Sequence, residues 1–176
     1  MPYQHRLALE QDLPAIVAIY NSTVASRMVT ADTSEVSVAD RLPWFAAHQT
    51  GKRPLWVVED AAGEILGWLS FSNFYGRPAY AGTAELSIYL APNARGKGLG
   101  RYLLEQAILA APALHLHTLL GFIFGHNLPS LNLFEVYGFA RWAHLPEVAI
   151  LDGVARDLII VGKKIDGQPE LSAFST

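Results

Sequence analysis

The stretch "APNARGKGLGRYLLEQAILAA", residues 91–111, decides more about the fold than any other part of the chain. It begins with a glycine-rich run and continues into residues whose apolar side chains recur at helical spacing. The glycines are Gly96, Gly98 and Gly100, and the apolar helix face comprises Leu103, Leu104, Ala107, Ile108 and Ala111. Glycine lets a backbone approach a ligand closely, and a helix N-terminus presents unpaired N–H groups. The stretch therefore predicts a phosphate-binding loop that opens a helix.

The spacing of this loop excludes two common nucleotide sites. A P-loop needs Gly-Lys followed by Ser or Thr, whereas Lys97 is followed by Gly98. A dinucleotide loop needs G-x-G-x-x-G and an acidic residue about 20 positions later, but here the spacing is G-x-G-x-G and an apolar "TLLGFIF" follows. The basic side chains of Arg95, Lys97 and Arg101 still favour a pyrophosphate. A turn that only caps the helix is the alternative.

Composition limits the function classes. The 176 residues are 51% hydrophobic and 16% charged, with a formal net charge of -3 and no cysteine. The missing basic surplus gives no support to a nucleic-acid partner, and the missing cysteine excludes disulfides and thiolate chemistry. Because no window reaches the roughly 18 apolar residues of a membrane span, we expect no membrane partner and a cytoplasmic enzyme. We expect a single domain over residues 1–164 and a poorly ordered C-terminal tail over 165–176.

The hydrophobic periodicity predicts about seven strands and four helices, and hence the α+β class. We expect helices within residues 12–20, 37–49, 98–111 and 128–138, and strands within 3–11, 54–74, 83–90, 116–125 and 139–164. Asp12 and Ser37 are candidate N-caps. Asp152-Gly153 is expected to turn the last hairpin. Hairpins at both ends, with strand–helix–strand crossovers between them, predict a mixed sheet.

Two motifs in the right order resemble those of the GNAT N-acetyltransferases. "RGKGLG" follows the strand "AELSIYLAP" and resembles their acetyl-CoA motif, and "GHNLPSLNLFEVYGFA" resembles their downstream signature. "AIYN", "RLPWFAAH" and "TAELSIYL" resemble the phosphinothricin and methionine sulfoximine acetyltransferase branch. The resemblance implies a mixed, mostly antiparallel seven-stranded sheet flanked by about four helices. It also implies a splayed parallel pair of strands at the acetyl-CoA site.

The resemblance further implies which residues bind acetyl-CoA as co-substrate. The backbone of Ile88, Tyr89 and Leu90 is expected to pair with the pantetheine arm, and an N–H near Leu90 to polarise the thioester carbonyl as a catalytic group. The pyrophosphate is expected on the loop Arg95, Gly96, Lys97, Gly98, Leu99 and Gly100. Asn127 and Ser130 are further coenzyme contacts. The acetyl group then passes directly to the amine, with no acyl-enzyme.

The resemblance implies a general base in this chain, but the residue at the position of the usual acid differs. By the resemblance, Glu85 matches the glutamate that this branch uses as general base, directly or through a water. Burial in an apolar cleft would raise the pKa of its carboxyl group toward the working range. An exposed strand glutamate is the alternative. The family often has Tyr or His as the acid where this chain has Phe134, which cannot give up a proton. Tyr137 and His126 could substitute, or each could be structural.

The acceptor site is expected around the loop "NFYGRPAYAG", residues 73–82, and the start of the following strand. The candidate substrate contacts are Tyr75, Gly76, Arg77, Glu85, Leu86 and Ser87. This branch has a basic residue where the chain has Tyr75, and Arg77 could grip a substrate carboxylate instead. Tyr20, Asn21, Arg27, Trp44, Phe74 and Tyr80 are further candidate walls. The six histidines show no metal-ligand spacing, so we expect no metal.

The leading hypothesis is therefore an acetyl-CoA-dependent N-acetyltransferase that acts on the primary amine of a small molecule. The acceptor would be an amino acid or an analogue resembling phosphinothricin or methionine sulfoximine. A non-catalytic acyl-CoA-binding module and a protein or peptide N-acetyltransferase are the alternatives. The resemblance also implies a homodimer.

Overall fold

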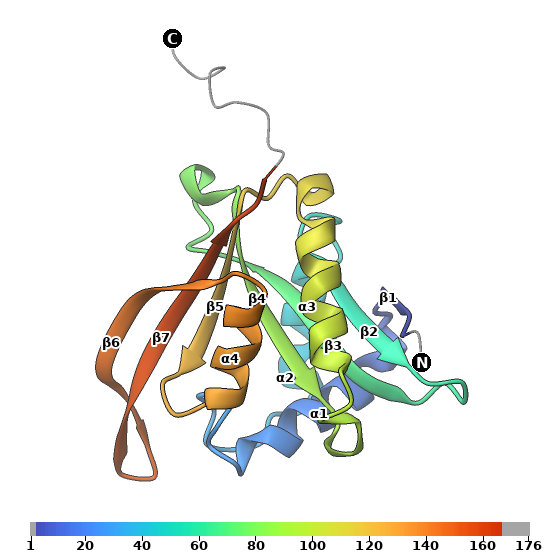
Figure 1. The fold of residues 1–176 in the computed structure, drawn as a ribbon. Helices are drawn as coiled ribbons and strands as arrows, with labels where there is room; N and C mark the ends of the chain where they lie inside the picture. The colour runs from blue at the N-terminus through green and yellow to red at the C-terminus, as the bar shows by residue number, and fades with distance from the viewer. Residues whose placement is uncertain (1–2, 167–176) are drawn as a thin grey trace.

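A seven-stranded mixed sheet forms the centre of the protein in the computed structural model, which describes residues 3–166 (Figure 1). Its strands are β1 (His5–Leu7), β2 (Leu55–Glu59), β3 (Ile65–Asn73), β4 (Thr83–Leu90), β5 (Thr118–Phe124), β6 (Ala140–Leu151) and β7 (Val154–Lys164). Their order across the sheet is β1-β2-β3-β4-β5-β7-β6. Only β4 and β5 pair in parallel, and every other neighbouring pair is antiparallel. The predicted fold class is confirmed.

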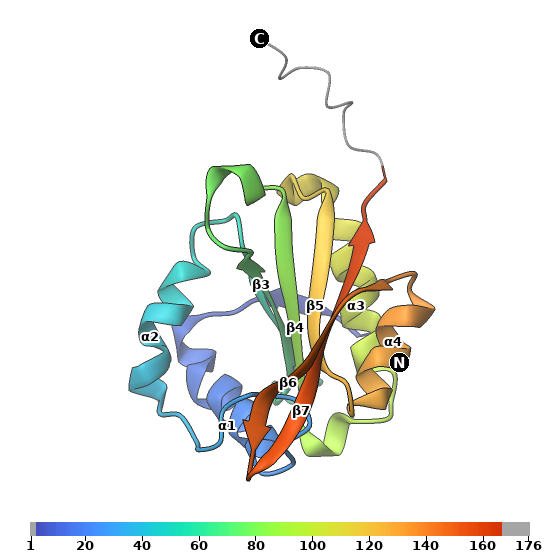
Figure 2. The ribbon, with the colours of Figure 1, turned by 90° about the vertical axis from the view of Figure 1, so that its left-hand side faces the viewer.

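Four α-helices cover the two faces of the sheet, as Figures 1 and 2 show. The helices α1 (Leu13–Val24) and α2 (Val38–Ala47) lie on one face, and α3 (Leu99–Ala110) and α4 (Leu128–Val136) lie on the other. Short 3-10 turns occupy Glu10–Asp12, Pro78–Tyr80, Pro92–Ala94 and Pro112–Leu114. The two faces therefore meet different elements, and the odd and even residues of each strand have different surroundings.

The predicted helix starts show two different uses of a polar cap. Ser37 and Asp40 form a reciprocal capping box at α2: the Ser37 hydroxyl accepts the Asp40 N–H, and the Asp40 carboxylate accepts the Ser37 N–H. Asp12 stands at the N-cap position of α1, as predicted, but makes no side-chain cap bond there. Its carboxylate instead accepts the Leu9 N–H and pairs with Arg6 at 2.7 Å.

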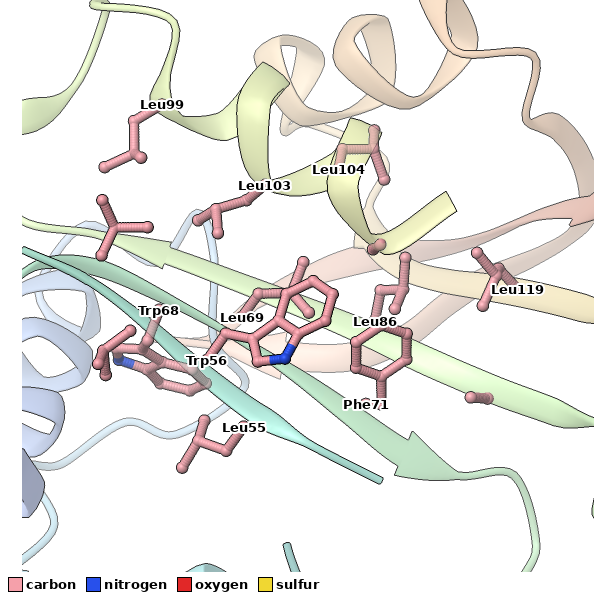
Figure 3. Close-up of a cluster of buried hydrophobic side chains, with 14 of the residues drawn as sticks. Leu55, Trp56, Trp68, Leu69, Phe71, Leu86, Leu99, Leu103, Leu104 and Leu119 are labelled. Atoms are coloured by element: carbon pink, nitrogen blue, oxygen red, sulfur yellow. The ribbon is translucent and has the colours of Figure 1, made fainter. Parts of the chain in front are cut away.

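On one face of the sheet, apolar side chains from β2, β3, β4 and β5 meet α3 in the hydrophobic core (Figure 3), and buried residues of α1 also belong to this core. Leu103, Leu104 and Ala107 of α3 are fully buried, which confirms the predicted apolar face. They pack over sheet residues that include Trp56, Leu69, Phe71, Leu86 and Leu119. Burying each large apolar side chain contributes about 1.5–3 kcal/mol. This packing fixes the point at which the glycine loop enters α3.

The C-terminal hairpin turns at Asp152-Gly153, as the sequence predicts. Both residues have positive φ angles, 52° and 77°, which suit a tight turn between right-twisted strands. After β7 the chain stays packed for one more residue, because Ile165 is 9% exposed and its N–H bonds the His117 carbonyl. The rest of the expected tail, from 167 to 176, lies outside the described residues. Within the described part, no helix is both long and apolar enough to cross a bilayer.

Candidate active site

A cavity of about 640 Å³ opens where β4 and β5 separate. The two strands pair only from Thr83–Thr118 to Glu85–Leu120, although β4 continues for five more residues. The lining residues come from α1 and the segment after it, β4, the glycine loop, β5 and α4. They are Thr23, Ser26, Met28, Val29, Leu86–Leu90, Arg95, Gly96, Gly98, Gly100, Arg101, Phe122, Ile123, Asn127, Pro129, Ser130, Leu133 and Phe134. The expected splayed parallel pair is therefore present, and it forms a cavity.

The backbone of β4 offers hydrogen-bonding groups to this cavity. The Ala91 N–H donates to the carbonyl of Leu66 in β3. Along an antiparallel strand, the backbone N–H and C=O groups of alternate residues point toward the partner strand and away from it. The N–H groups of Leu90 and Ile88 therefore point toward β5, where pairing has already ended. The Leu90 carbonyl is engaged by the Arg95 side chain at 3.3 Å. This arrangement leaves extended backbone available to pair with a ligand in the gap.

The glycine loop has the conformation that a phosphate cradle requires. Gly96 and Gly98 have φ angles of 71° and 86°, a region that side chains other than glycine rarely adopt. A Cβ atom placed at either position would meet no protein atom within 4 Å, so both positions face open space. The helix α3 starts at Leu99, and its first N–H groups have no partner within the helix. The loop fits a pyrophosphate through its backbone donors.

The basic side chains of this loop are not equivalent. Arg101 lines the cavity from the first turn of α3. Arg95 turns back to bond Leu90 and Ser22, so part of its donor capacity holds β4 and α1 together. The Lys97 side chain is exposed and does not line the cavity. Leu99 is fully buried and does not line the cavity, so its contact with a ligand stays a prediction.

Glu85 lies on the face of β4 opposite α3. It pairs across the strands with Ser72 of β3 and Leu120 of β5, and burial raises the pKa of its carboxyl group. Ser87 and Tyr89 share its face because they alternate with it along the strand. Leu86 faces the other way, is 3% exposed and packs in the core. The predicted base therefore has the environment expected of it, while contact of Leu86 with an acceptor stays a prediction.

An aromatic cluster lies beside this face at the loop between β3 and β4. The rings of Phe74, Tyr75 and Tyr80 contact one another with centroids 4.7–5.8 Å apart, and Phe74 lies 6.5 Å from Phe122 of β5. Tyr75 and Gly76 turn the loop with φ angles of 58° and 61°, and Tyr75 is 76% exposed. Arg77 is exposed, and its side chain has no hydrogen-bond or ion-pair partner within residues 3–166.

The other candidate wall residues lie behind the cavity and shape the chain between α1 and α2. Asn21 exchanges two hydrogen bonds with the Val36 backbone. Tyr20 donates to Asp32, and the Arg41 guanidinium covers the Tyr20 ring at 4.4 Å. None of these side chains, nor Trp44, lines the cavity. The sequence did not indicate that Thr23, Ser26, Met28 and Val29 line the cavity. The i, i+3 spacing of Thr23 and Ser26, which places both on one helix face, is the signal that could have identified these two.

Asn127 and its neighbours hold this missed segment in place. The Asn127 amide donates to the Met28 carbonyl at 3.0 Å, while its oxygen accepts the Ser130 N–H and so caps α4. His126 donates through Nε2 to the Arg27 carbonyl at 2.8 Å, because a carbonyl can only accept. Arg27 also pairs with Asp152 at 2.8 Å. Both polar ends of Asn127 are thus engaged within the protein, and its contact with coenzyme stays a prediction.

No acidic hydroxyl takes the place of the family acid at position 134. Phe134 is 5% exposed, lines the cavity and packs on Phe139 with ring centroids 4.9 Å apart. Tyr137 packs against the core, and His126 is engaged by Arg27. Neither of these two lines the cavity. The side chain at position 134 therefore cannot act as the proton donor, and neither substitute named from the sequence lines the cavity.

Comparison with known proteins agrees with this geometry. Residues 16–139 match the model of the Acetyltransferase (GNAT) family. The chain is 56% identical over 160 residues to "Putative phosphinothricin acetyltransferase YwnH" of Bacillus subtilis, covering 91% of this chain and 98% of that one. It is 36% identical to an L-methionine sulfoximine/L-methionine sulfone acetyltransferase of Pseudomonas paraeruginosa, covering 88% and 90%.

The chain is also similar to a solved structure that contains bound acetyl-CoA. It is that of a GNAT superfamily phosphinothricin acetyltransferase from Sinorhizobium meliloti in complex with AcCoA. Its TM-score against this chain is 0.90 at 27% sequence identity, and the match covers 99% of this chain and 96% of that one. The chain therefore belongs to the GNAT acetyltransferase family, within the branch of the phosphinothricin, methionine sulfoximine and amino-acid N-acyltransferases.

Proposed function

We propose that the protein transfers the acetyl group of acetyl-CoA directly to the primary amine of a small amino acid or of an analogue such as phosphinothricin or methionine sulfoximine. The observation that carries the proposal is that one strand, β4, joins two features. The glycine loop and the free edge of β4 at the cavity suit the coenzyme, and the partly buried Glu85, which does not itself line the cavity, lies on a face of the same strand.

The residues of the chain divide the chemistry between them. Acetyl-CoA supplies an activated acetyl group as a thioester. Backbone N–H groups of Gly96, Gly98 and Gly100 hold the pyrophosphate, and the N–H of Leu90 or Ile88 lies toward the gap, where it can polarise a carbonyl. Glu85 accepts the proton that the ammonium group must lose before the nitrogen can attack.

The leaving thiolate needs no acid from the protein. Attack by the amine forms the new C–N bond, the nitrogen releases its second proton to solvent, and collapse of the tetrahedral centre breaks the C–S bond. The thiol of coenzyme A has a pKa close to that of free cysteine, about 8.5, so the thiolate can leave and take its proton from solvent. This accommodates Phe134 at the position where the family often has Tyr or His.

The acceptor face suits a small molecule with a carboxylate. Arg77 offers an exposed guanidinium without a hydrogen-bond or ion-pair partner among residues 3–166, and the rings of Tyr80 and Phe122 contact Phe74 of the same loop. Guanidinium binds carboxylate through two parallel hydrogen bonds. An amino acid can thus present its amine to Glu85 while its carboxylate contacts Arg77.

Thiol release tests the proposal. The protein is incubated with acetyl-CoA and a panel comprising L-amino acids, methionine sulfoximine, phosphinothricin and short peptides. We expect turnover with at least one amino acid or analogue and little with peptides. Loss of turnover in Glu85→Gln, with acetyl-CoA binding retained, supports the role of Glu85. Turnover with peptides alone, or full activity in Glu85→Gln, contradicts the proposal.

A non-catalytic acyl-CoA-binding module is the second candidate, and Phe134 is the observation that favours it. Calorimetry distinguishes the two. Tight binding of acetyl-CoA without thiol release on any amine would support the module.

We also propose that the protein is a homodimer joined through the β6–β7 hairpin. β6 is an edge strand of the sheet and exposes the apolar side chains of Trp142, Val148 and Ile150, and Val154 at the start of β7 is exposed as well. An exposed edge strand with apolar side chains pairs readily with another chain. Sedimentation should give the mass of two chains, and Ile150→Asp should shift it toward one. A wild-type monomer contradicts this arrangement.

A further inference from the structure

The peptide between Lys97 and Gly98 is held from outside the glycine loop. The hydroxyl of Tyr3, 94 residues earlier in the chain, donates to the Lys97 carbonyl at 2.9 Å. Residues 3–166 contain no cis peptide bond. In a trans peptide the C=O and N–H groups point in opposite directions. The Gly98 N–H is therefore directed away from Tyr3.

The side opposite Tyr3 is the cavity. Gly98 lines the cavity, whereas Lys97 and Tyr3 do not. The Gly98 N–H has no acceptor within the part of the chain that the structure describes. Its direction thus places a free donor where a phosphate oxygen would lie.

The same peptide is easily rotated without such a contact. Its rotation changes ψ of Lys97 and φ of Gly98; Gly98 lies in the left-handed region, and glycine populates positive and negative φ about equally. An exposed Lys97 side chain does nothing to fix it. A hydrogen bond to the carbonyl of this peptide therefore selects one orientation among several that the glycines allow.

Tyr3 is itself well anchored. Its ring lies 5.7 Å from that of Tyr102 in the first turn of α3, and the Tyr102 hydroxyl bonds Nδ1 of His5 at 2.8 Å. The His5 ring lies 4.3 Å from Trp56 of β2. The segment that carries Tyr3 is thus tied to the same helix whose N-terminus completes the loop.

We propose that Tyr3 is a positioning residue for the coenzyme: its hydroxyl fixes the Lys97–Gly98 peptide so that the Gly98 N–H donates to the pyrophosphate. The inference rests on the proposed function, which places acetyl-CoA in this cavity. It adds a residue of the N-terminal segment to a site otherwise built from β4, β5 and the helices.

Tyr3→Phe tests the proposal because it removes only the hydroxyl. We expect acetyl-CoA and dephospho-coenzyme A to bind about fivefold more weakly by calorimetry, the effect of one lost hydrogen bond. S-acetylpantetheine lacks the pyrophosphate, so its kcat/KM should stay the same in the variant and the wild type. The melting temperature reports on the fold of each variant.

Tyr102→Phe is the matched control. It removes a hydroxyl that only helps to anchor the segment and leaves the Tyr3 bond to Lys97 in place, so acetyl-CoA affinity should fall by much less than in Tyr3→Phe. Unaltered acetyl-CoA binding by Tyr3→Phe would overturn the inference, and so would an equal loss with S-acetylpantetheine. So would an equal loss of affinity in Tyr102→Phe. Failure of the wild type to bind acetyl-CoA would contradict the proposed function itself, and this inference with it.

Discussion

The proposed coenzyme side and the proposed acceptor side of this site differ in what they offer a ligand. The glycine loop offers backbone donors, and its geometry is set by left-handed glycines and by the start of α3. The proposed acceptor side offers side chains, namely Glu85 on a strand and Arg77 on an exposed loop. A backbone site can change little without losing its function, whereas a side-chain site can change its ligand through single substitutions.

Removing the proposed base should have the largest effect and should affect only the acceptor side. We expect Glu85→Gln to lower kcat about 100-fold, because general base catalysis commonly contributes that much or more. Acetyl-CoA affinity should stay unchanged by calorimetry. In the wild type, the activity should rise with pH through the pKa of Glu85, which burial raises, and this limb should vanish in the variant. If Glu85→Gln also lost affinity for acetyl-CoA, the separation of the site into a coenzyme side and an acceptor side would be wrong.

Gly98→Ala should damage the coenzyme side. An alanine in the left-handed region is strained by about 1–2 kcal/mol, and its methyl group would project into open space beside the ligand. We expect acetyl-CoA affinity to fall about tenfold, with KM for the amine unchanged.

Gly63→Ala is the matched control for this variant. Gly63 has a similar φ of 83° and equally open surroundings, but it lies in the turn between β2 and β3. It should lose stability without losing coenzyme affinity. Equal affinities for Gly98→Ala and wild type would show that the loop does not carry the pyrophosphate.

Arg77→Met should test whether Arg77 binds the carboxylate of the acceptor. We expect KM for an amino acid to rise about five- to tenfold, since the guanidinium is exposed and its charge-assisted bonds lie at the weak end of their range. The decarboxylated amine of the same acceptor should show no change, because it has no carboxylate to lose. Steady-state kinetics with methionine and 3-(methylthio)propylamine measures the difference, and equal changes for both would exclude Arg77 as the carboxylate contact.

The smallest expected effect is on stability. Burial raises the pKa of Glu85 in the folded state, so the folded protein binds this proton more tightly than the unfolded chain does. Protonation of Glu85 therefore adds to the free energy of unfolding at low pH, and this contribution is lost as the pH rises through the pKa of the folded state. Glu85→Gln should therefore have a slightly higher Tm than wild type at pH 7, and the difference should shrink as the pH falls to about 4. A lower Tm at pH 7 would contradict this.

The features that the sequence predicts well are those fixed by local backbone geometry. The glycine loop, the apolar face of α3, the Ser37 cap and the Asp152-Gly153 turn each depend on residues close in sequence, and the structure contains all four. The fold class follows from the same patterns together with the family resemblance.

The features that it predicts poorly depend on contacts between distant residues. Nothing local to Asn127 indicates that its amide reaches the Met28 carbonyl, 99 residues away. Arg95 is basic and adjacent to the loop, yet it turns back to Leu90 and Ser22. Motif matching names such residues without showing which way their side chains point.

The alternation of β4 has a consequence for how this enzyme can diversify. Even-numbered residues such as Leu86 pack in the core, odd-numbered residues such as Glu85 lie on the face proposed for the acceptor, and the backbone edge that points away from β3 borders the cavity proposed for the coenzyme. Substitutions on the odd positions can therefore retune the choice of amine while leaving core and coenzyme untouched. Insertion or deletion of one residue, by contrast, would exchange Glu85 for a neighbouring core side chain and end both functions at once. Specificity in this strand can thus evolve by substitution but not by change of length.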